Sequence, residues 1–138
     1  MRAWLVRGVS MAVVHAVVLT AVADVRVTHP DWTAWARPLS LAVLAVLAML
    51  WGGLDTWQGR TGHGMVWFRA ALLAGPTAGV LGLVGQGLLV DKTGVEALGA
   101  AVTGGAAFTA LLVLVPAFAG LALARITSHP AAAEQRQV

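Results

Sequence analysis

The chain has 138 residues, of which 59% are hydrophobic and 11% are charged, and its mean hydropathy is +0.81. This composition is typical of a membrane protein, and no segment outside the apolar stretches is long enough to bury a soluble core. The absence of cysteine excludes disulfides, thiolate zinc sites, iron–sulfur clusters and a cysteine nucleophile. The net charge of +3 is spread over segment ends without a basic patch, so we expect no nucleic-acid partner.

Four apolar stretches fill most of the chain, and each is about as long as a helix that crosses a bilayer. They predict an all-α membrane protein, a bundle of four transmembrane helices in a single domain over residues 1–127. We expect residues 128–138 to form a short, disordered cytoplasmic tail, because they are polar and carry a proline. The four predicted helices cover residues 4–23, 38–54, 67–90 and 97–124.

The basic residues predict the orientation of these helices. With the N-terminus inside, six of the nine lie on the cytoplasmic side, which favours two cytoplasmic termini in a multi-pass protein of the cytoplasmic (inner) membrane. The six are Arg2, Arg7, Arg60, Arg69, Arg125 and Arg136, and the three outer ones are Arg26, Arg37 and Lys92.

The six tryptophans support the same placement of the helix ends. All of them lie near predicted membrane interfaces, where an indole ring contacts the acyl boundary and its N–H reaches water. They are Trp4, Trp32, Trp35, Trp51, Trp57 and Trp67.

The first apolar stretch has an alternative interpretation. Arg2 and Arg7, followed by an apolar run that ends in small residues at 21–23, also fit a secretory signal, whose cleavage would leave three helices. We expect the helix to be retained, because Arg7 beside Trp4 suits an anchored helix end.

Prolines and glycines separate the predicted helices. Pro30 ends the first helix, and residues 31–35 then predict a short amphipathic turn on the outer interface. Pro38 is predicted to start the second helix, where no N–H donor is needed. The glycine-rich segment 59–64 is short, which makes the second and third helices antiparallel neighbours.

Small residues predict how the last two helices pack. One face of the third helix carries small residues that let backbones approach closely, and a matching stripe on the fourth helix predicts a seam between them. The two stripes are Gly75, Gly79, Gly82 and Gln86 on the third helix, and Ala97, Ala101, Gly105 and Thr109 on the fourth. Pro76 and Pro116 lie inside these helices and predict kinks.

Ionisable groups within the membrane are the strongest functional signal. His15 lies near the middle of the first helix, where it would carry a proton or bind a cation. The alternative is a neutral imidazole bonded to a neighbouring helix, at Thr77 or Gln86.

Asp55 lies near the inner interface, and we expect it to pair with Arg7 or Arg69 in an ion pair that fixes helix positions.

Catalysis has little support in the sequence. The serines lack a nearby base, and the four histidines show no metal-ligand spacing, so we expect no enzyme and no metal. A haem would need a second histidine at the depth of His15, which is missing, so we expect no cofactor.

Three segments carry a family resemblance. They are Trp4-x-x-Arg7-Gly8, Trp51-Gly52-Gly53-Leu54-Asp55 and the run at 106–117. The chain resembles small actinobacterial four-helix membrane proteins described as drug/metabolite-type transporters. The resemblance implies an inner-membrane exporter of a small molecule. Small multidrug exporters of that wider group carry a proton-coupling glutamate in the first helix, where this chain offers only His15.

Two functions remain open from the sequence. A transporter of four helices would have to be a homodimer, with His15, Gln86 and Asp55 as candidates for proton or substrate coupling. The alternative is a non-catalytic accessory subunit of a larger membrane complex, such as a respiratory, secretion or lipid-export assembly.

Overall fold

A computed structural model describes residues 3–59, 63–90 and 97–128, and every secondary-structure element in this part of the chain is a helix. Four helices are long and apolar enough to cross a membrane, so the all-α prediction is confirmed. The elements are α1 (Ala3–Thr28), the 3₁₀-helix η1 (Pro30–Trp32), α2 (Thr33–Trp57), α3 (His63–Leu89), α4 (Ala97–Ala100), the π-helix η2 (Ala101–Gly105) and α5 (Ala106–Ser128).

Several sequence predictions lie outside the described residues. They concern the basic residues Arg2, Arg60, Lys92 and Arg136, and the tail at 129–138.

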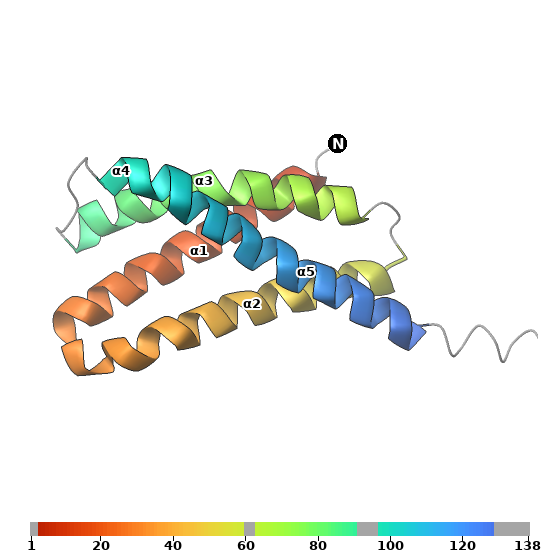
Figure 1. The fold of residues 1–138 in the computed structure, drawn as a ribbon, viewed down its shortest axis with the longest axis horizontal. Coiled ribbons are helices and arrows are strands. Elements are labelled where there is room, and N and C mark those ends of the chain that lie inside the picture. The colour runs from red at the N-terminus through yellow and green to blue at the C-terminus, as the bar shows by residue number, and fades with distance from the viewer. Residues whose placement is uncertain (1–2, 60–62, 91–96, 129–138) are drawn as a thin grey trace, which may run out of the picture.

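The helices associate as two parallel pairs. In Figure 1, α1 and α3 run from right to left, whereas α2 and α5 run from left to right. The helix α1 packs on α3 and α2 packs on α5, and α3 and α5 join the two pairs. One end of the bundle therefore holds the α1–η1–α2 turn and α4, and the other holds the start of α1 and the end of α5.

The start of α2 differs from the prediction. The helix begins at Thr33, and Pro38 lies inside it. The separate amphipathic turn predicted at 31–35 is also wrong, because η1 ends at Trp32 and the α-helix follows at once. A proline near the start of a helix removes only one backbone hydrogen bond, so the first turn forms ahead of it.

The last of the four long apolar helical segments, Ala101–Thr127, begins with a π-helical turn at η2. A π-turn inserts an extra residue, so Ala101 and Ala106, five positions apart, both face α3. The prediction for Gly105 is therefore wrong: this residue is exposed, and a Cβ added to it would meet only the carbonyl oxygen of Ala100.

Glycines bring the helix backbones into contact. On α3, Gly75 and Gly79 face the backbones of Ala106 and Ala101, which confirms that part of the predicted seam. Gly82 also packs closely, but against Leu19 of α1 rather than the last helix.

A second seam, between α2 and α5, was not predicted. A Cβ on Gly52 would collide with the backbone of Ala117, and one on Gly120 would collide with that of Met49. The core around both seams is built mainly of alanine, with a few larger side chains. Its members are Met11, Ala12, Ala48, Trp67, Ala71, Ala74, Ala78, Val113, Ala117 and Leu121.

Candidate functional site

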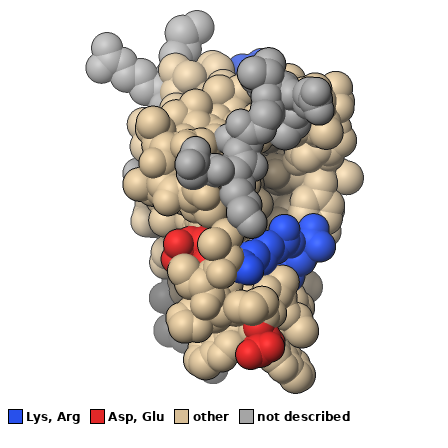
Figure 2. Space-filling view, turned by 90° about the vertical axis from the view of Figure 1, so that its left-hand side faces the viewer, with Lys and Arg blue, Asp and Glu red and all other residues tan. Residues whose placement is uncertain are grey.

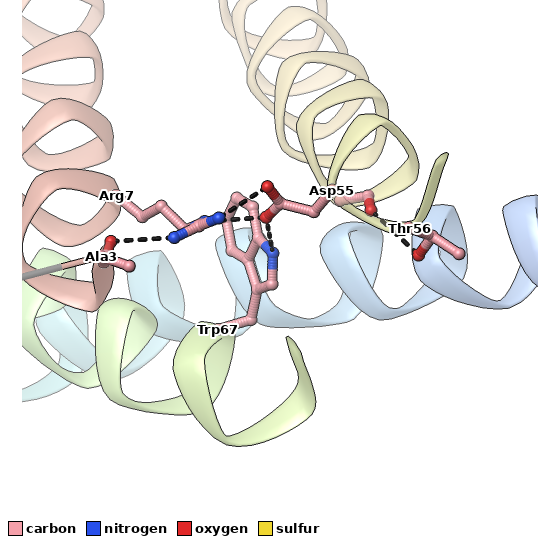
Figure 3. Close-up of polar contacts among 6 residues, drawn as sticks. Ala3, Arg7, Asp55, Thr56 and Trp67 are labelled. Carbon is pink, nitrogen blue, oxygen red and sulfur yellow. Dashed lines mark hydrogen bonds and ion pairs between the residues drawn. The ribbon is translucent and has the colours of Figure 1, made fainter. Parts of the chain in front are cut away.

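A buried ion pair joins α1 to α2 at the end of the bundle that holds the start of α1. Arg7 donates two parallel hydrogen bonds to Asp55, from Nε to Oδ2 over 2.7 Å and from Nη2 to Oδ1 over 2.6 Å (Figure 3). The two side chains are only 5% and 3% exposed. This bidentate geometry is the strong form of an arginine–carboxylate contact, and it compensates both charges in the buried interior of the bundle.

Trp67 of α3 completes this cluster. Its Nε1–H donates to Asp55 Oδ2 over 2.9 Å, and Arg7 Nη1 donates to the Ala3 carbonyl over 3.0 Å. Trp67 also packs edge-to-face on Trp51, with ring centroids 6.1 Å apart. We call Arg7, Asp55 and Trp67 the ion-pair cluster. It ties α2 to both members of the α1/α3 pair.

Two sequence predictions meet at this cluster. The expected ion pair of Asp55 is confirmed with Arg7 as its partner, whereas Arg69 is exposed. The expectation that the Trp67 N–H reaches water is wrong, because this side chain is fully buried and donates to Asp55. An indole ring both fills the core and donates the hydrogen bond that the carboxylate needs, which explains its position.

His15 is buried in the first helix and differs from its predicted environment. Its Nδ1 lies 2.9 Å from the carbonyl oxygen of Met11, one turn earlier in α1, so the expected bond to Thr77 or Gln86 is wrong. A carbonyl only accepts, so Nδ1 carries the proton. The other ring nitrogen, Nε2, has no hydrogen-bond partner within the described part of the chain.

A cavity of about 530 Å³ lies toward the opposite end of the bundle. All four long helices line it: α1 with Arg26, α2 with Arg37 and Ser40, α3 with Gln86, and α5 with Phe108. Its volume lies within the range of small-molecule sites, about 300 to 1,000 Å³. We call it the arginine cavity. Gln86, a residue singled out from the sequence, lies in its wall, whereas His15 and Asp55 do not.

The charges around the arginine cavity are not paired with one another. Arg26 and Arg37 are both exposed, and neither lies within ion-pair distance of a carboxylate among the described residues. Asp24 instead lines a neighbouring cavity between α1 and α3. Figure 2 looks onto this end of the molecule, where a patch of basic side chains lies beside one acidic patch and above another. The sequence marked Arg26 and Arg37 only as signals of topology.

No three histidine, aspartate or glutamate side chains gather into a possible metal site in the described ranges. Neither a protein-family model nor a curated protein matches the chain. The arginine cavity and the ion-pair cluster are therefore the two candidate sites in the described residues.

Proposed function

We propose that this protein is a multi-pass protein of the cytoplasmic membrane that moves a small molecule across it, with the arginine cavity as the substrate site. The observation that carries this proposal is the asymmetry of the bundle. All four long helices contribute to a cavity toward one end, while buried contacts close the other end. A cavity at one end of the bundle with the other end closed is the arrangement expected of one state of a transporter.

The surface of the bundle supports insertion into a bilayer. Large apolar side chains are exposed along every long helix, among them Val17, Leu50, Leu72 and Phe118. Lipid is the environment in which such a surface is stable. In the orientation that the basic residues favour, the ion-pair cluster lies near the cytoplasm and the arginine cavity opens outward.

The ion-pair cluster also favours a retained first helix. Cleavage after Ala23 would remove Arg7 and leave Asp55 buried with only the Trp67 indole as donor. A buried carboxylate without its counter-charge is strongly unfavourable. We therefore propose that α1 belongs to the working protein.

The two helix pairs suggest how a second state arises. Asp55 on α2 holds the α2/α5 pair to Arg7 and Trp67 of the α1/α3 pair. Loss of these bonds would let the pairs separate at that end while they close around the cavity. In this scheme Asp55 is the coupling residue and Gln86 is a substrate contact. The unpartnered Nε2 of His15 is a second candidate for a proton.

The assembly we propose is a homodimer, because four helices enclose little volume for a complete pathway. The resemblance to four-helix drug/metabolite-type transporters supports the same activity.

An accessory subunit is the second candidate, and one groove favours it. A nearly nonpolar groove of about 350 Å³ lies between α2 and α5, lined by Leu50, Gly53, Trp57 and Leu123 among others. Such a groove suits an apolar helix of a larger complex.

Introduced cysteines test these alternatives, because the chain has none of its own. Ser40→Cys reports on the cavity, and Thr56→Cys on the half-buried residue beside Asp55. With a membrane-impermeant maleimide, we expect Ser40→Cys to react from outside in intact cells and Thr56→Cys to react weakly even after permeabilisation.

Adding Asp55→Asn should lower labelling of Ser40→Cys and raise that of Thr56→Cys. Trp67→Phe, which keeps the packing and removes one hydrogen bond, should act in the same direction more weakly. Arg69→Gln is the matched control, since it removes an exposed charge from the same end. Labelling that none of these variants changes would contradict transport and favour the accessory subunit.

A further inference from the structure

The arginine cavity combines an apolar wall with two arginines that pair with no carboxylate among the described residues. Arg26 projects from the last turn of α1 and Arg37 from the second turn of α2, so the turn between these helices brings both to one cavity. Their positive charges repel each other, and the carboxylates of Asp24 and Asp31 do not pair with either. An anion between the two guanidinium groups would relieve this repulsion.

Membrane topology does not account for these arginines. In the proposed orientation they lie on the outer side, where the bias in basic residues is weaker and arginine is not needed to retain a loop. Arginine is instead the side chain best suited to planar, bidentate contacts with phosphate or carboxylate.

The rest of the lining defines the other half of a ligand. Gln86 and Ser40 add an amide and a hydroxyl, and Leu19, Leu41 and Phe108 supply apolar surface. Ser40 already donates to the Arg37 carbonyl over 2.7 Å, which leaves its hydroxyl oxygen as an acceptor. A cation would be repelled by the arginines, and a fully polar anion would leave the apolar wall uncovered.

We propose that the arginine cavity binds an amphiphilic anion, with a single phosphate or carboxylate between Arg26 and Arg37 and an apolar body along Leu19 and Phe108. This inference rests on the proposed function and names the class of its substrate. The same chemistry has two sources: an anionic phospholipid that enters from the bilayer, and a soluble amphiphile that enters from the aqueous side.

Native mass spectrometry of the full chain in a neutral detergent tests this proposal. The probes are phosphatidylglycerol and octyl phosphate, and their controls without net charge are phosphatidylcholine and octanol. We expect at least one anionic probe to bind more tightly than its control. Each of Arg26→Gln and Arg37→Gln should weaken that binding about tenfold, the effect of losing one charge-assisted contact.

Arg69→Gln is the matched control, because it removes the same charge from an exposed position at the opposite end. It should leave binding unchanged. Preference for phosphatidylglycerol alone assigns the site to lipid, and displacement of phosphatidylglycerol by octyl phosphate assigns it to both sources. Equal binding by the two cavity variants and Arg69→Gln, or equal binding of charged and uncharged probes, would overturn the proposal.

The outcomes separate this inference from the proposed function. If anion binding depends on Arg26 and Arg37 but cysteine labelling does not shift, the protein has the anion site and the transport proposal is wrong. If labelling shifts as expected but neither arginine variant changes anion binding, the transport proposal stands and the anionic substrate is wrong.

Discussion

The two ends of the bundle use arginine in opposite ways. Arg7 is buried, and its guanidinium group donates hydrogen bonds to Asp55 and the Ala3 carbonyl. Arg26 and Arg37 are exposed and line a cavity. A charge enters the interior only with its partner in place, so the first arginine is committed to holding helices together. The other two face open space and remain available to a ligand. We therefore propose a structural role for the end that holds Arg7 and ligand binding at the end that holds Arg26 and Arg37.

The largest expected effect is on stability at the ion-pair cluster. Asp55→Ala leaves Arg7 buried without its counter-charge, which should lower the unfolding free energy by about 3 to 5 kcal/mol. Reversible unfolding in mixed micelles of detergent and SDS measures this loss. Arg69→Ala is the control and should cost little, because Arg69 is exposed. An Asp55→Ala variant as stable as the unmodified protein would show that the ion-pair cluster does not stabilise the fold.

A smaller loss is expected at the seam between α2 and α5. Gly52→Ala places a Cβ against the backbone of Ala117, which should destabilise the protein by about 1 to 3 kcal/mol. The same unfolding assay applies. Gly104→Ala is the control, because nothing lies near its added Cβ and alanine favours a helix. Equal stability of the two variants would show that the α2–α5 contact is looser than described.

The contribution of Trp67 should be similar in size. Trp67→Phe keeps an aromatic ring in the core and removes the hydrogen bond to Asp55, for a loss of about 1.5 to 3 kcal/mol at most. Trp57→Phe, at an exposed tryptophan of α2, should have almost no effect. If the two substitutions cost the same, the indole N–H contributes nothing to the cluster.

The smallest effect on stability is expected at the cavity end. Arg26→Gln should change the unfolding free energy by no more than about 0.5 kcal/mol, because the Arg26 side chain is exposed. The same variant should weaken binding of an amphiphilic anion. A large loss of stability would show that Arg26, like Arg7, holds the helices together, which would contradict the proposed difference between the two ends.

Apolar runs of this length predict the number of helices well, because crossing a bilayer requires about 20 apolar residues whatever the packing. The need to neutralise Asp55 likewise predicted an arginine partner. Which arginine pairs with Asp55, Arg7 or Arg69, could not be predicted from the sequence, because it depends on how α1 and α3 are rotated about their axes. Burial of Trp67 has the same origin.

Errors in the small-residue pattern come from local backbone geometry. A spacing of four residues marked Gly105 for the seam, and the π-turn at η2 moved Ala106 there instead. The arginine cavity was missed for another reason. Arg26 and Arg37 lie near the ends of separate predicted helices, and only the turn at η1 brings them to one site. Of the polar residues that line this cavity, only Gln86 was a candidate for coupling in the sequence analysis.

The most direct test of the whole account is labelling of Ser40→Cys and Thr56→Cys with and without octyl phosphate. We expect octyl phosphate to protect Ser40→Cys and to expose Thr56→Cys. Arg26→Gln should abolish both changes, and Arg69→Gln should preserve them. Protection of Ser40→Cys without any change at Thr56→Cys would reduce the protein to a binding module. No change at either position would contradict the assignment of recognition to the arginine cavity.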